Sequence, residues 1–212
     1  MPAEVAVYAL MDAKALWNLA VPFAPPGTST QGRPTLPVAE WQPVLDFVWN
    51  NVDGPVSLGF VVTPAPRMIV CAPLKSGAPV KSSFNQIVTL LRMQKLVEST
   101  IAQANAQADM TVLKLAKGAP MPELVFAFTS QVMLITDSLD TATKALAAGS
   151  ARNGLARNAE FTAARTKANV SAGQLFWLFG SGAAAGLPAG LNVSVRREGG
   201  GLSFSGFVPL PR

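Results

Sequence analysis

The stretch ELVFAFTSQVMLITDSLDTATKALAAGSARNGLARNAEF, Glu123–Phe161, decides the fold. Two apolar runs within it, Leu124–Phe128 and Gln131–Thr136, are separated by only two small polar residues. Apolar runs joined by such a short polar connection are typical of a β-hairpin. In the second run both sets of alternate residues are largely apolar, which favours a central position in a sheet.

A helix follows this hairpin. Asp137 and Ser138 offer N-cap oxygens, and Asp140 places a carboxylate where the helix dipole favours it. Gly149 marks the end of this helix. Asn158 is a good N-cap for a second short helix that carries Phe161.

The same patterns predict further elements on both sides of this stretch. Strands are expected at Val5–Leu10, Val56–Val62, Arg67–Leu74, Thr111–Ala116, Gln174–Phe179, Asn192–Arg197 and Leu202–Val208. Helices are expected over residues 13–19 with Asp12 as cap, over Glu40–Asn50, and from a capping box at Ser83–Gln86 to Gln107. The expected apolar faces are Trp41, Val44, Leu45, Val48 and Trp49 in the second helix, Phe84, Ile87, Val88, Leu91, Val97 and Ile101 in the third, and Val193, Val195, Phe204 and Val208 in the last hairpin.

Strands cluster in consecutive runs between the helices, with short turns inside each run. This order predicts an α+β fold, a mainly antiparallel sheet with helices packed on it, in one domain over residues 1–212. Residues 3–17 and 171–187 share a strand-then-small-helix pattern, and each is later followed by two adjacent strands. One interpretation is a degenerate internal duplication, with a second half-repeat at 171–212 and a terminal hairpin that completes a sheet begun at the N-terminus.

The composition excludes several classes of protein. Hydrophobic residues make up 50% of the 212 residues and charged residues only 14%, against roughly 25% charged in an average globular chain. Such a chain has a lightly charged surface, or it hides surface against a partner, a lipid or another copy of itself. The net charge of +5 comes from scattered basic residues, so a nucleic-acid-binding stripe is not expected. No apolar run approaches the length of a membrane span.

The residues that carry most enzyme chemistry are missing. The chain has no histidine and one cysteine, Cys71, which we interpret as a buried structural thiol. It has no phosphate-binding glycine motif. Lys14, Lys95 or Ser181 could serve a Ser–Lys mechanism, although no spacing favours it. We therefore expect no catalytic residue, cofactor or metal, and keep an enzyme of unrecognised type as an alternative.

The candidate contact residues for a partner or ligand are Phe23, Trp41, Trp49, Arg196 and Arg197. Phe23 lies in a proline-rich loop at residues 21–37, long enough to suggest a lid or docking arm, or a surface insertion of no special role. The two tryptophans share one side of a helix, a pattern that is also typical of a core. Arg196 and Arg197 are adjacent basic residues in the terminal hairpin.

The order of elements resembles a known group of proteins. A strand and helix (VMLITDSLDTATKALAAG), the segment Asn158–Phe161, the strand LFWLF and the hairpin LNVSVRREGGGLSFSGFV are similar to the repeating unit of bacterial exported proteins with domains of unknown function. The resemblance covers roughly residues 123–208. It implies an envelope-associated protein without an assigned activity, and it transfers no functional residue.

The leading hypothesis is a non-catalytic interaction or scaffold domain of the bacterial envelope or of a larger assembly, with a protein partner or self-association. The alternative is a carrier of an apolar ligand such as a lipid or pigment. We expect a periplasmic or extracytoplasmic location with the leader outside this chain. Because Met1–Glu4 lead directly into a strand, a cytoplasmic location stays open.

Overall fold

The computed structural model describes residues 5–12, 14–15, 29–30, 33–34, 42–61, 66–119, 121–150, 154–170, 174–181, 191–199 and 201–207. The strands in these residues are β1 (Val7–Met11), β2 (Ser29–Thr30), β3 (Arg33–Pro34), β4 (Val56–Val61), β5 (Arg67–Pro73), β6 (Val97–Gln103), β7 (Asp109–Leu115), β8 (Glu123–Phe128), β9 (Val132–Thr136), β10 (Gln174–Gly180), β11 (Leu191–Glu198) and β12 (Gly201–Phe207). The helices are α2 (Gln42–Asn51), α3 (Val80–Met93), α4 (Leu139–Ser150), the short η3 (Leu155–Arg157) and α5 (Ala159–Lys167).

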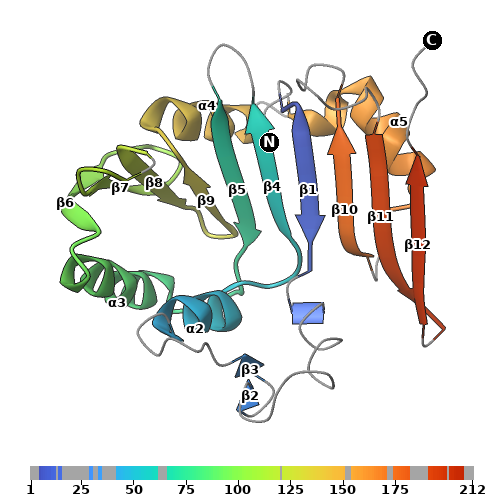
Figure 1. The fold of residues 1–212 in the computed structure, drawn as a ribbon. Coiled ribbons are helices and arrows are strands. Elements are labelled where there is room, and N and C mark those ends of the chain that lie inside the picture. Colours follow the sequence, from blue (N-terminus) through green and yellow to red (C-terminus); the bar gives the residue numbers. More distant parts are fainter. Residues whose placement is uncertain are drawn as a thin grey trace.

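A 10-stranded sheet, in the order β12-β11-β10-β1-β4-β5-β9-β8-β7-β6, organises the described chain (Figure 1). Its neighbouring strands are antiparallel, and β1 pairs with β10 on one side and with β4 on the other. The expectation that the terminal hairpin completes a sheet begun at the N-terminus is confirmed. The predicted antiparallel sheet with helices packed on it is confirmed as well, whereas the internal duplication stays a prediction.

The first face of the sheet packs against α4, η3 and α5. Phe161 of α5 lies at the centre of an aromatic cluster on this face: its ring centroid is 5.1 Å from that of Tyr8, 5.1 Å from that of Trp177 and 5.4 Å from that of Phe179. Trp177 and Phe179 are fully buried. These rings hold β1, β10 and α5 together, and we call this side the helix-covered face.

A buried asparagine links β10, β11 and α5. Asn192 of β11 accepts a hydrogen bond from the Trp177 indole at 2.7 Å and donates one to the backbone carbonyl of Ala164 at 2.8 Å. Its side chain is 4% exposed. Because a buried polar group without a partner is costly, this pair of bonds fixes α5 against the sheet.

The opposite face of the sheet has a second, smaller core under α2 and α3. Phe47 of α2 and Phe84 of α3 are buried there with residues of β5 to β9, and Phe84 lies 4.8 Å from Phe126 and 5.0 Å from Phe128 between ring centroids. This second core covers the β5–β6 end of the sheet and stops at Val56 of β4, which packs at its edge.

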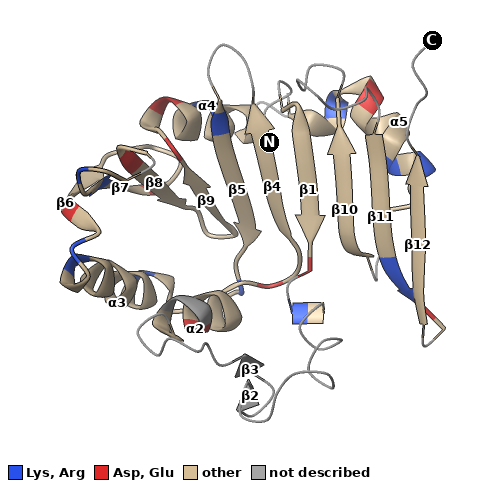
Figure 2. Cartoon of the chain, in the orientation of Figure 1, with Lys and Arg blue, Asp and Glu red and all other residues tan. Residues whose placement is uncertain are grey.

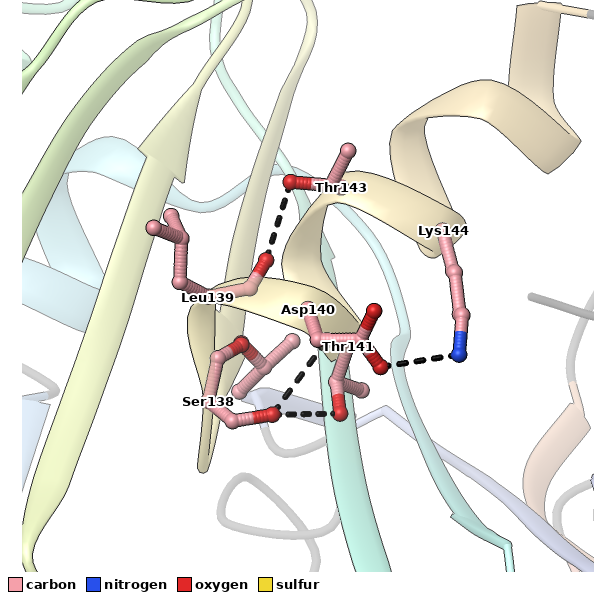
Figure 3. A network of polar contacts seen from close by, with 7 residues as sticks. Ser138, Leu139, Asp140, Thr141, Thr143 and Lys144 are labelled. Atoms are coloured by element: carbon pink, nitrogen blue, oxygen red, sulfur yellow. Dashed lines mark hydrogen bonds and ion pairs between the residues drawn. The ribbon is translucent and has the colours of Figure 1, made fainter.

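The start of α4 is capped as the sequence predicts. The Ser138 hydroxyl accepts a hydrogen bond from the Thr141 backbone N–H at 3.2 Å, and Asp140 pairs with Lys144 at 2.8 Å (Figure 3). Asp137 has another role, because it accepts a hydrogen bond from the Met68 backbone N–H at 3.0 Å. The Asn158 cap of α5 is also confirmed, by a 3.0 Å bond from the Phe161 N–H.

The predicted long helix from Ser83 to Gln107 is wrong in its second half and in its start. Helix α3 ends at Met93, the chain reverses at Lys95 with a φ of +56°, and β6 follows. Val97 and Ile101 fit a helical spacing, but the β-branched residues of VESTIAQ fit a strand, and pairing with β7 prevails. The helix begins at Val80 after Pro79, without a side-chain cap.

Two predicted apolar faces differ in part from the structure. In the described part of α2, Phe47 is buried although the predicted face omitted it, and Val48 of the predicted face packs against the same core. In the terminal hairpin Phe204 is 72% exposed, and the buried positions of β11 are the polar Asn192 and Ser194. The hydrophobic pattern of β11 and β12 was correct, but the helices pack on the other face.

In the parts of the chain that the structure describes, none of the helices has the length and apolar character needed to cross a membrane.

We predict that Asn192→Ala lowers the free energy of unfolding by about 2 to 3 kcal/mol, mainly because the Trp177 indole N–H is left buried without an acceptor. Urea unfolding followed by circular dichroism measures this change. The control is Asn85→Ala on the exposed side of α3, where we expect a change within about 0.5 kcal/mol. Equal effects of the two variants would contradict the role of Asn192.

Candidate interaction surface

Five strands at one end of the sheet, β4, β1, β10, β11 and β12, carry apolar side chains on the same face. Residues directly opposite each other in antiparallel strands share a face, and Ala9 lies opposite both Leu178 and Leu58. Ala9, Leu178 and Leu58, and the alternate residues that share their face, point away from the aromatic cluster. We call this side the open face; its side chains are Val7, Ala9, Met11, Val56, Leu58, Phe60, Phe176, Leu178, Leu191, Val193, Val195, Leu202 and Phe204.

The open face has large apolar side chains in contact with solvent. Phe204 is 72% exposed, Leu202 47%, Met11 42% and Phe60 40%. Figure 1 shows α4 and α5 on one side of these strands, and none of the described helices lies across β1, β10, β11 and β12 on the other side. Single exposed apolar residues are ordinary, but a contiguous apolar patch on a folded chain is typical of a binding surface.

The open face is nearly free of charge. Strands β1, β4, β10 and β12 contain no Lys, Arg, Asp or Glu and are tan in Figure 2. Arg197 is the charged residue of β11 that shares this face, because it lies two residues beyond Val195 and opposite Leu202. Depletion of charge together with exposed aromatic rings is typical of the centre of a protein–protein interface.

The structure places the predicted contact residues in different surroundings. Phe23 and Trp41, with most of the 21–37 loop, lie outside the described residues. Trp49 is half-buried near the end of α2, and the Lys14 ammonium lies 5.8 Å from the centroid of its ring. Trp49 therefore contributes a cation–π contact rather than a position on the open face.

Arg196 and Arg197 do not act as one basic pair, since successive strand residues point to opposite faces. Arg196 pairs with Glu198 at 2.5 Å on the helix-covered face. Arg197 is exposed on the open face. The two arginines are adjacent in the sequence, but their side chains lie on opposite faces of the sheet.

Two lysines meet at the carboxyl end of α2. The Lys14 ammonium donates to the Val52 carbonyl, and the Lys75 ammonium donates to the Trp49 carbonyl at 3.1 Å. Burial first, and then the neighbouring Lys75, lower the pKa of Lys14. Cations at unpaired helix carbonyls stabilise the helix end, so this cluster has a structural explanation.

The groups considered for a Ser–Lys mechanism are not brought together. The Ser181 N–H bonds to the Ala6 carbonyl at one end of β1, whereas Lys14 follows the other end of that strand. Cys71 packs against the core of the helix-covered face, and burial raises the pKa of its thiol. Among the described side chains, no three His, Cys, Asp or Glu residues converge on a position that could hold a metal ion.

One groove among the described residues is open to solvent and has a mixed polar and apolar lining. It has a volume of about 780 Å³ and lies between the start of α3, the 104–108 loop and the turn at residues 128–130. Lys81 at its rim pairs with Asp109 at 2.6 Å, and both side chains are mostly exposed. A site for a lipid or pigment is usually concave and apolar, so this groove does not favour the carrier hypothesis.

Sequence reasoning missed the open face, although a signal was present. The strands Val7–Met11, Val56–Val61 and Gln174–Gly180 are apolar at most positions, and this pattern was used above only to predict strands. The signal is the small number of expected helices relative to the number of expected strands. Few helices cannot cover both faces of a wide sheet, so part of one face is left without a helix.

Comparisons of the chain with protein-family models, with curated proteins and with solved structures found no match. The resemblance to exported bacterial families therefore stays a prediction, and the case for a function depends on the geometry above.

We predict that Phe204→Ala changes the free energy of unfolding by less than about 1 kcal/mol, because most of this ring already contacts water. The matched variant Phe179→Ala removes a ring with 0% exposure and is expected to cost about 3 to 5 kcal/mol. Urea unfolding of both variants provides the comparison. Similar losses would mean that Phe204 is covered in solution.

Proposed function

We propose that this chain is a non-catalytic interaction domain that binds a protein partner through the open face. The observation that carries this proposal is a contiguous apolar surface over five strands with Phe60 and Phe204 exposed to solvent. Covering this surface removes apolar area from water, which stabilises a complex by roughly 25 cal/mol for each Å² buried before the costs of association.

The shape of the surface favours a protein over a small apolar ligand. The open face is a sheet surface rather than an enclosed pocket, and its side chains follow five adjacent strands. Small apolar ligands bind mostly in concavities that surround them. A sheet face is complemented by a second layer of helices or strands, as in most protein domains.

The charge of the surface favours a protein over a membrane. Proteins that rest on anionic lipid surround their apolar contact with several Lys or Arg residues. In the described strands of the open face, the register places one basic residue, Arg197, on this face. An apolar partner surface with a polar rim complements this face.

The location we propose is the bacterial envelope, and the resemblance of residues 123–208 to exported proteins supports it. Fractionation of the cells that make the protein, with an antibody against the chain, tests this location. Recovery in the cytoplasmic fraction alone would contradict it. The carrier of an apolar ligand is the alternative, and organic extraction of gently purified protein that yields no lipid or pigment would end it.

We predict that a photoreactive phenylalanine analogue at position 60 crosslinks to a partner protein in the cells that make this chain. Position 60 is on the open face, and position 93 on α3 is the control, because Met93 is 75% exposed away from that face. The proposal is supported if crosslinks form from position 60 and not from position 93. Met11→Lys is expected to abolish these crosslinks, and Leu96→Lys is expected to leave them unchanged. Equal products from positions 60 and 93 would contradict the proposal.

A further inference from the structure

The two edges of the sheet differ in how well they are protected from pairing. At one edge β6 carries Glu98 and a register irregularity between Val97 and Ser99. A charge and a bulge are the usual devices that keep an edge strand from pairing with another chain. The β6 edge is therefore protected.

The other edge, β12, has neither device. Gly201–Phe207 contains no charged residue and no proline, and its register with β11 is regular over all seven residues. In the sheet β12 has β11 on one side, and none of the described strands pairs with its other side. In an antiparallel strand alternate residues direct their N–H and C=O groups outward, so this edge is a template for another strand.

The sequence of β12 is complementary to itself. When two copies of GLSFSGF run antiparallel about a two-fold axis at Phe204, all seven residues pair. Phe204 then meets Phe204, Ser203 meets Ser205, Leu202 meets Gly206, and Phe207 meets Gly201. Each of the other large side chains thus lies opposite a glycine, and the serine pairs can exchange hydrogen bonds.

The faces of the two copies also match in this arrangement. Phe204 and Leu202 lie on the open face in both copies, because a two-fold axis perpendicular to the sheet keeps each face on its own side. Phe207 lies on the helix-covered face, where the Lys167 ammonium is 3.1 Å from its ring centroid. We propose that a second copy of this chain binds at β12, so that two sheets join into one continuous sheet with a two-fold axis at Phe204.

This proposal uses the edge of the sheet and does not depend on a partner at the open face. The dimer would place the two open faces side by side and create one wider apolar surface. An isologous contact of this kind closes after two copies. A discrete dimer is therefore expected rather than an open-ended polymer.

The test exploits the position of Phe204 on the axis, where each variant side chain faces its own copy. Sedimentation velocity at about 0.1 mM is suitable, since a contact limited to strand edges is small for a protein interface. We expect the wild-type chain to sediment as a dimer. Phe204→Lys alone and Phe204→Glu alone are expected to be monomers, because like charges directly opposite each other are destabilising. An equimolar mixture of the two variants is expected to recover the dimer.

Phe60→Lys is the matched control, because it places the same charge on the open face four strands away from the edge. We expect it to remain dimeric. Circular dichroism of each variant checks that it is folded, which the 72% exposure of Phe204 favours. A monomeric wild-type chain, a mixture that stays monomeric, or a dimer broken by Phe60→Lys rather than by the variants at position 204 would overturn the proposal.

Discussion

The pairing of β1 with β10 is the constraint on which the rest of the structure depends. It joins residues 7–11 to residues 176–180 and so places the first strand, β1, in one sheet with the last three strands, β10 to β12. The pairing also brings Tyr8 beside Trp177, with ring centroids 5.5 Å apart, and places both against Phe161. Because these rings and the Asn192 bonds all lie on one face, α5 covers that face. The hairpin β11–β12 extends the sheet beyond the reach of α2 and α3.

The open face follows from the order of the strands. The chain passes from β9 to β10 through α4, η3 and α5, which bury the helix-covered face on the way. On the opposite face α2 and α3 bury the region around Phe128 and Met133 and extend only to Val56. Strands β1 and β10, which are apolar on both faces, then have one face in contact with solvent. Phe204 lies where this open face meets the unprotected edge, so one residue belongs to both proposed contact surfaces.

Local signals in the sequence were sufficient for the β4–β5, β8–β9 and β11–β12 hairpins and for two caps. The Thr129–Ser130 connection, the Ser138 cap and the Asn158 cap each depend on residues within a few positions, and each was predicted correctly. The boundary between α3 and β6 could not be predicted in this way, since Val97 and Ile101 fit both periods and pairing with β7 decides between them. The same limit applies to Phe204. Alternating residues show that a strand has two faces, but they do not show which face a helix covers. The pairing of Trp177 with Asn192 also depends on β10 and β11 being neighbours, and no local pattern records that.

The central claim is that half of one sheet face is uncovered, and solvent relaxation in nuclear magnetic resonance tests it most directly. A soluble gadolinium chelate broadens methyl signals according to their distance from solvent. The account predicts strong broadening for the Leu202 methyls, which are on the open face, in a sample held monomeric by Phe204→Lys. The methyls of Val125 and Leu113, both 0% exposed, are predicted to stay sharp. Protection of Leu202 to the same degree as Val125 would show that this face is covered within the chain, and it would contradict the account.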